Sequence, residues 1–152
     1  SEVNKGSKFI ISLPLSKKTI TKETQIVSTP SKFNPHKILL VDDEEIVLEI
    51  AKELLEEIGN SVIAVDSGEK ALQAIEENPD IDIAILDRIL PTISGIDLFR
   101  QLKANYPKLN IIISSGLTED KSIQELKKEG LLGYITKPFR LEDICNVINR
   151  IE

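Results

Sequence analysis

The sequence has few of the residues that mark several protein classes. Its 152 residues include one cysteine, Cys145, no methionine, no tryptophan and 4% aromatic residues. A single cysteine excludes an intrachain disulfide, which agrees with a reducing cytosol. No apolar run approaches the ~20 residues of a membrane-spanning helix, and no signal peptide is visible. The absence of methionine, the initiator included, indicates a fragment of a longer chain. We expect a cytoplasmic segment without membrane contact.

Positive charge is scarce after residue 36. Residues 1–36 hold six lysines and two glutamates, whereas residues 37–152 hold 13 Lys/Arg against 23 Asp/Glu. A surface with this excess of negative charge repels phosphate backbones. The main part of the chain is therefore not expected to bind nucleic acid directly.

Short apolar runs alternate with amphipathic stretches through residues 37–152. Five runs, rich in Ile, Val and Leu and too short for helices, are interpreted as buried strands: Lys37–Val41, Ser61–Val65, Asp82–Leu86, Asn110–Ser114 and Leu132–Thr136. Five stretches have helical spacing: Glu45–Ile58, Ser67–Glu77, Gly95–Asn105, Thr118–Glu129 and Leu141–Ile151. Five strand–helix units predict an α/β fold, a parallel sheet with helices on both faces.

The polar residues with chemical potential follow the predicted strands. Asp42 and Asp43 follow the first, Asp87 the third, Ser115 the fourth and Lys137 the fifth. Ligands of such sheets bind beyond the carboxyl ends of the strands, so these side chains share one rim. Clustered carboxylates suit Mg²⁺, and a metal beside a lysine and a hydroxyl suits phosphoryl transfer. One of the three acids can then be the nucleophile that forms an aspartyl phosphate.

Four motifs in this part of the chain stand in the order and spacing of a known family. They are ILLVDDEE, ILDRILPTISG, IIISSG and GYITKPF, and through them residues 37–152 resemble response-regulator receiver domains, the CheY-like superfamily. The resemblance implies the flavodoxin-like receiver fold with strand order 2-1-3-4-5. It also implies a phosphoacceptor module of a two-component phosphorelay.

The resemblance gives each matched residue a role. Asp87 is the implied phospho-acceptor, and Lys137, in a cis bond to Pro138, is the implied partner of the phosphoryl group. Mg²⁺ would be bound directly by Asp43 and Asp87, through a water by Asp42, and by the backbone carbonyl of Ile89. Ser115 is the implied switch hydroxyl and Tyr134 the implied switch aromatic residue. Pro91 and Gly95 would shape the loop after the acceptor.

The chain departs from the usual pattern of the family at three positions. Ile89 and Leu90 precede Pro91 where the family often has a polar residue and Met, and Gly116 stands where Ala is commonest. None of these changes removes a reactive group. An apolar Ile89 beside the phosphoryl group is expected to change how fast water attacks it.

The N-terminal part has a second resemblance. The segment NKGSKFIISLPL is similar to the closing strand of the ATP-binding domain of sensor histidine kinases, which places residues 1–15 in such a domain. Residues 16–36 are polar, contain two prolines and show no period, as is typical of a linker. The implied whole is the C-terminal end of a hybrid histidine kinase.

The resemblance implies the reaction and the partner. A histidine kinase or a histidine phosphotransfer protein would supply phosphohistidine, and the domain would catalyse its own phosphorylation and lose the phosphoryl group slowly. Two alternatives remain open: a phosphorylation-independent interaction module, and an aspartyl-phosphate phosphatase on a similar sheet. The phosphatase family wants a second acid where this chain has Ile89. A nucleotide-binding Rossmann domain is excluded because no glycine-rich turn follows the first strand.

The first predicted helix also suggests where the partner docks. At 100° per residue, Val47, Ile50, Ala51, Leu54 and Ile58 define its buried face. Ile46 and Leu48 fall about 100° to either side of Val47. Both are large and apolar and border the acid cluster, and the family resemblance implies that they dock the helical, histidine-bearing partner. The alternative is that they are scattered surface hydrophobes.

Overall fold

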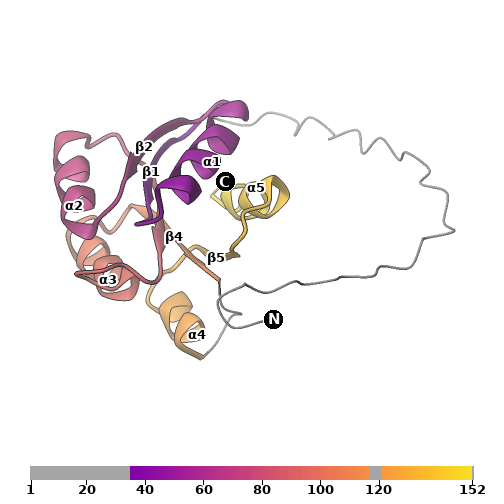
Figure 1. Ribbon diagram of the computed structural model, residues 1–152. Helices are drawn as coiled ribbons and strands as arrows, with labels where there is room; N and C mark the ends of the chain where they lie inside the picture. Colours follow the sequence, from indigo (N-terminus) through magenta and orange to yellow (C-terminus); the bar gives the residue numbers. More distant parts are fainter. Residues whose placement is uncertain (1–34, 117–120, 152) are drawn as a thin grey trace, which may run out of the picture. The chain divides into compact units, whose positions relative to one another are not determined.

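The fold is a five-stranded parallel sheet between two layers of helices (Figure 1). The computed structural model describes residues 35–116 and 121–151. The strand order is β2-β1-β3-β4-β5, and the strands are β1 (Lys37–Val41), β2 (Ser61–Val65), β3 (Ile83–Asp87), β4 (Asn110–Ser115) and β5 (Gly133–Thr136). The predicted fold class and the strand order implied by the resemblance are both confirmed.

One helix follows each strand. The helices are α1 (Glu45–Glu57), α2 (Gly68–Glu77), α3 (Gly95–Asn105), α4 (Lys121–Lys128) and α5 (Leu141–Ile148). Ser67 and Ser94 begin α2 and α3 by accepting hydrogen bonds from backbone N–H groups in the first turn. Gly59 and Gly130 follow α1 and α4 with φ of 94° and 98°, the left-handed conformation expected of a glycine after a helix.

Two hydrophobic clusters, one on each face of the sheet, form the core. The central strands supply both, because successive side chains point to opposite faces: in β3, Ile83 and Ile85 join one cluster while Ala84 and Leu86 join the other. The smaller cluster packs against α1 and α5, and the larger one packs against α2, α3 and α4 (Figure 1). The two faces of the sheet therefore pack against different sets of helices.

The expected burial of α1 is wrong at two positions. Ile50, expected in the core, is 52% exposed, and Leu48, expected outside it, packs against the smaller cluster. Ala51 and Leu55 are the fully buried residues of the helix. The buried stripe is thus rotated toward Leu48 and Leu55, because the helix has more apolar positions than one face can bury and the small Ala51 faces the sheet.

Other differences follow from position in the sheet. β2, expected to be buried, is one of the two edge strands of the described sheet and is only partly buried. α5 ends three residues before the predicted Ile151.

Residues 117–120 lie outside the described part, so the predicted start of α4 at Thr118 does too. No helix among the described residues is long and apolar enough to cross a membrane.

The expected segments 1–15 and 16–36 fall almost wholly outside the described residues. His36, the last residue of the expected linker, is described, and it is bonded to the sheet. Its Nδ1 lies 2.7 Å from Asp82 Oδ2, and its backbone N–H donates to Asn60 Oδ1 at 3.0 Å. The backbone N–H of the next residue, Lys37, donates to Asp82 Oδ1 at 3.0 Å. Among the described residues, His36 therefore belongs to the hydrogen-bonded structure of the domain.

Close packing of α5 on β5 yields a stability prediction. A Cβ at Gly133 would overlap the side chain of Val147, whereas a Cβ at Gly116 would meet no atom within 4 Å. We expect Gly133→Ala to lower the free energy of unfolding by about 1–3 kcal/mol, the usual cost of overpacking. Gly116→Ala, the matched control, should leave it unchanged or slightly raised. Urea denaturation measures both, and equal effects would contradict the packing argument.

Candidate functional site

The carboxyl ends of the strands bring together the polar residues predicted from the sequence. Asp42 follows β1, Asp87 ends β3, Ser115 ends β4 and Lys137 follows β5. The parallel register places Asp87 opposite Ser114, one residue before the end of β4. All four side chains therefore lie at the carboxyl-terminal end of the parallel strands, as predicted.

Three carboxylates form the centre of this edge. Asp42, Asp43 and Asp87 each offer an oxygen, and the three oxygens lie within 4.8 Å of one another. Asp42 and Asp87 are buried, whereas Asp43 is exposed. Asp42 is fixed by its backbone N–H, which donates to Val65 O at 3.2 Å, and by its Oδ1, which accepts from Glu44 N at 3.1 Å. The arrangement suits a hard cation that takes oxygen ligands and keeps water on its open side.

Lys137 supplies the positive charge among these acids. Its Nζ lies 2.5 Å from Asp42 Oδ2, 3.1 Å from Asp87 Oδ2 and 3.8 Å from Glu44 Oε1, and its side chain is only 14% exposed. Burial alone would lower the pKa of Lys137, but Asp42 and Asp87 outweigh burial and raise it above its usual value. The ammonium is therefore charged at any physiological pH. The Lys137–Pro138 bond is cis, as the resemblance implied.

Burial and the charge of Lys137 have opposite effects on the pKa of Asp87. Burial raises the pKa of its carboxyl above the ordinary value, and the neighbouring charge of Asp42 adds to the rise. Hydrogen bonding and attraction from Lys137 oppose the rise, and so does a backbone hydrogen bond from Ile89. One lysine faces three carboxylates, so negative charge remains in excess and a further cation would be stabilised here.

The backbone around Asp87 leaves no room for adjustment. The N–H of Arg88 donates to Ser114 O at 2.9 Å, and the carbonyl of Arg88 accepts from Gly95 N at 3.0 Å. A Cβ at Gly95 would overlap the carbonyl oxygen of Asp87, so only glycine allows α3 to begin this close to the acid. Gly95 thus shapes the loop after Asp87, as expected.

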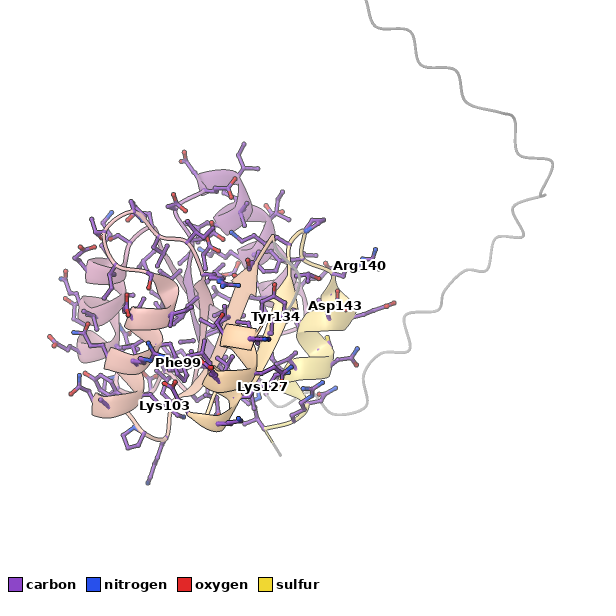
Figure 2. The ribbon with its side chains drawn as sticks, turned by 90° about the horizontal axis from the view of Figure 1, so that it is seen from below. Phe99, Lys103, Lys127, Tyr134, Arg140 and Asp143 are labelled. Atoms are coloured by element: carbon purple, nitrogen blue, oxygen red, sulfur yellow. The ribbon has the colours of Figure 1, made fainter. Side chains whose placement is uncertain are left out.

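The remaining candidates surround this centre. Ser115 is buried, and its carbonyl accepts from Lys137 N at 2.8 Å. Tyr134 is partly buried and packs against the larger core cluster, on the side of the sheet that α4 covers (Figure 2). Ile89 is 66% exposed, so its apolar side chain stands in solvent beside the acids.

The sequence did not indicate three residues that the structure adds to this region. Glu44, within the acid run, approaches Lys137. Ile50 lies one helical turn after Ile46, and the two side chains are 52% and 72% exposed. Together with Ile89, they are the large hydrophobic residues that are exposed in the described part of the chain. Arg88 reaches α4, as described below. Glu44 stood in the quoted acid run, but no sequence pattern separates Ile50 from its buried neighbours.

Comparison with protein families identifies the family of the chain. Residues 38–149 match the response regulator receiver domain. The chain belongs to this family. It is therefore a receiver domain of the kind found in two-component systems, and its receiver fold carries an acid cluster at the edge where the family residues were expected.

The related proteins include sensor kinases and a chemotaxis protein. The chain is 29% identical to the sensor kinase CckA of Brucella abortus over 99% of its length, and 30% identical to the sensor protein TorS of Escherichia coli over 88%. It spans only 17% and 14% of those proteins. It is 28% identical to the chemotaxis protein CheY of Halobacterium salinarum, and 75% of this chain aligns with 94% of that one.

Solved structures give the same result. A receiver domain protein from Clostridium thermocellum is similar with a TM-score of 0.72 and 35% identity, covering 76% of this chain and 93% of that one. A BeF3-activated DrrB receiver domain is similar with a TM-score of 0.66 and 28% identity, covering 78% and 97%.

Burial of Asp87 predicts a gain in stability when its charge is removed. In EDTA at pH 7, Asp87→Asn should raise Tm, because the variant no longer buries an incompletely compensated charge and Lys137 keeps Asp42 as partner. A gain of about 1 kcal/mol corresponds to about 4 °C. Because the folded pKa lies above the unfolded value, the cost of the charge is full above the folded pKa. It disappears as the pH falls below the unfolded pKa of about 3.9, so the gain should shrink toward pH 4.

An exposed acid provides the control. Asp66 pairs with Lys70 at 2.7 Å, and this pairing lowers the pKa of Asp66. Asp66→Asn should therefore not raise Tm at pH 7. Thermal unfolding at several pH values tests both variants, and a loss of stability in Asp87→Asn at pH 7 would show that Lys137 fully compensates Asp87.

Proposed function

We propose that this receiver domain accepts a phosphoryl group on Asp87 from a phosphohistidine, with Mg²⁺ held by the same edge of the sheet. The observation that carries the proposal is the approach of three carboxylate oxygens within 4.8 Å, with Lys137 bound to two of the acids. Acids at this spacing repel one another unless cations lie among them. One lysine and one divalent ion would meet that need.

The donor set fits Mg²⁺. Asp43 and Asp87 would bind the ion directly, Asp42 through a water, and Ile89 through its backbone carbonyl, with further waters on the exposed side of Asp43. Mg²⁺ takes six oxygen ligands and retains several waters, so an open carboxylate site is appropriate. When bound, the ion supplies charge that neutralises the oxygens of the transferring group.

The chain's own residues would position the reactants. An oxygen of Asp87 forms the bond to phosphorus, the phosphorus–nitrogen bond of phosphohistidine breaks, and its electron pair stays on the imidazole nitrogen. Lys137 pairs with a phosphoryl oxygen as a point charge, which requires only a short movement from Asp87. Most of the rate then comes from alignment and charge compensation rather than from further covalent chemistry.

The phosphorylated domain would change an interaction surface through Ser115 and Tyr134. Ser115 ends β4 beside Asp87, and Tyr134 lies on β5 against the larger core cluster. A new anion at Asp87 would attract the Ser115 hydroxyl and so bias the packing of Tyr134 between two positions. The readout is a surface on the side of the sheet covered by α4.

We further propose that the chain is the receiver-containing part of a hybrid histidine kinase. Its similarity to CckA covers 99% of the chain, which includes the segments expected to close a kinase domain and to link it to the receiver. The donor is then a histidine kinase or a histidine phosphotransfer protein. An aspartyl-phosphate phosphatase is disfavoured because Ile89, where that family wants an acid, cannot transfer a proton. A phosphorylation-independent module is disfavoured by the complete set of acids and lysine.

Incubation with acetyl phosphate tests the reaction. The protein should gain one phosphoryl group by mass spectrometry with Mg²⁺ and none in EDTA, and Asp87→Asn should gain none. Asp43→Ala should lose most of the Mg²⁺-dependent labelling, because it removes a ligand. Glu45→Ala, which removes the same charge from an exposed position nearby, should keep it. Labelling of Asp87→Asn at the wild-type rate would refute the assignment of the acceptor.

The exposed isoleucines of α1 predict the docking surface of the phosphodonor. Ile46 and Ile50 lie one turn apart on the exposed side of the helix that begins beside the acids, whereas Leu48 is partly taken up by the core. Ile46→Glu and Ile50→Glu should each slow transfer from a phosphorylated histidine protein about tenfold, or ~1.4 kcal/mol. Labelling by acetyl phosphate should not change, because that small donor needs no docking surface.

A charge control separates docking from electrostatics. Gln73→Glu adds the same negative charge to an exposed position of α2, away from α1. It should leave both donors unaffected. If the α1 variants slow both donors equally, the isoleucines support the reaction centre rather than the partner, and if they slow neither, the partner docks elsewhere.

A further inference from the structure

Arg88, directly after the acceptor, faces the opposite side of the sheet. Along β3, Ile83 and Ile85 belong to the cluster under α1 and α5, and Leu86 belongs to the cluster under α2, α3 and α4. Because side chains alternate, Asp87 continues the first series and Arg88 the second. Asp87 and Arg88 are adjacent in the chain, but the Arg88 side chain lies on the side of the sheet that α4 covers.

The backbone of Arg88 is fixed to the elements that hold the acceptor. Its N–H donates to Ser114 in β4, and its carbonyl accepts from Gly95 at the start of α3. Arg88 cannot shift without moving Asp87, and a displacement of Asp87 is passed directly to Arg88. The arginine side chain is thus an extension of the acceptor loop.

The side chain of Arg88 ends on α4. Its Nη2 donates to Ser122 Oγ at 3.1 Å, in a partly buried contact between residues 34 positions apart. α4 is a short helix with two buried side chains, Ile123 and Leu126, and its other described surface is mostly polar. A helix held by so little apolar area depends on its polar contacts for position, and a hydrogen bond from a charged group is among the stronger of these.

A second arginine contacts the other end of this helix region in a different way. Arg100 on α3 makes two hydrogen bonds to Glu129, at 3.0 and 3.1 Å, and both side chains are largely exposed. Exposed pairs contribute little, and salt screens them. Among the described residues, the hydrogen bonds and the ion pair of Arg100 are with Glu129 and not with the acceptor loop, so Arg100 provides a control for Arg88.

We infer that Arg88 is a positioning residue that couples Asp87 to α4 through Ser122. The inference rests on the proposed function, since the signal to be transmitted is the phosphoryl group on Asp87. Arg88 does not touch the reacting atoms. It sets where α4 lies for each state of the acceptor, in parallel with the change at Ser115 and Tyr134.

The test follows the amides of α4 by NMR while BeF3 and Mg²⁺ are added as a stand-in for the phosphoryl group. In the wild type, both the acceptor loop and α4 should shift. In Ser122→Ala, the chemical-shift changes of the acceptor loop should remain. The chemical-shift changes of the α4 amides should be about fivefold smaller than in the wild type. Arg88→Ala, which removes every contact of this side chain, should give at least the same loss, and the double variant should lose no more than Arg88→Ala alone.

Two further variants distinguish coupling from loss of structure. Ser122→Thr keeps the hydroxyl and should restore the response of α4. Arg100→Ala cuts the other arginine contact and should leave the response intact. A full α4 response in Ser122→Ala, or an equal loss in Arg100→Ala, would overturn the inference.

Failure of the proposed function can be recognised separately. If BeF3 and Mg²⁺ shift nothing at Asp87 in the wild type, the phosphoacceptor assignment fails. Coupling is then tested by Asp87→Asn, which changes the charge of the acceptor without any ligand. This substitution should shift the α4 amides when Ser122 is present and shift them much less in the Ser122→Ala background, and equal shifts in both backgrounds would overturn the coupling.

Discussion

The site depends on the incomplete compensation of buried negative charge. Asp42 and Asp87 are buried, and the ammonium of Lys137 lies close to both. A buried charge is tolerated only when paired and hydrogen-bonded. One lysine for two buried acids and a third exposed one leaves an excess of negative charge. This excess would attract a further cation to the site.

The fold holds these charges together against their repulsion. The acids come from β1 and β3, adjacent at the centre of the sheet, and the lysine follows β5 at its edge. Both faces of the central strands are packed, so the strand ends cannot separate without opening a core. Gly95 adds a second constraint, since it lets α3 press on the carbonyl of Asp87. Stability generated by packing is thus used to keep reactive groups in place.

Most of the fold and the centre of the site could be predicted from the sequence. Alternating strands and helices determine a parallel sheet, and a parallel sheet brings residues that follow its strands, such as Asp42 and Lys137, to one edge. The orientation of α1 could not be predicted, because Leu48 and Ile50 are equally apolar and only contact with the sheet decides which is buried. Arg88 was missed because its contact with Ser122 spans 34 positions and leaves no local pattern.

The opposite directions of Asp87 and Arg88 have a consequence for how such domains can diversify. The partner docking that we propose on α1 and the response that we propose at α4 would rest on different cores, which lie on opposite faces of the sheet. Substitutions on one face therefore meet few partners on the other, and they can accumulate there independently. A duplicated copy of this domain could acquire a new upstream kinase by changes around Ile46 while it keeps its downstream target, or change the target while it keeps the kinase.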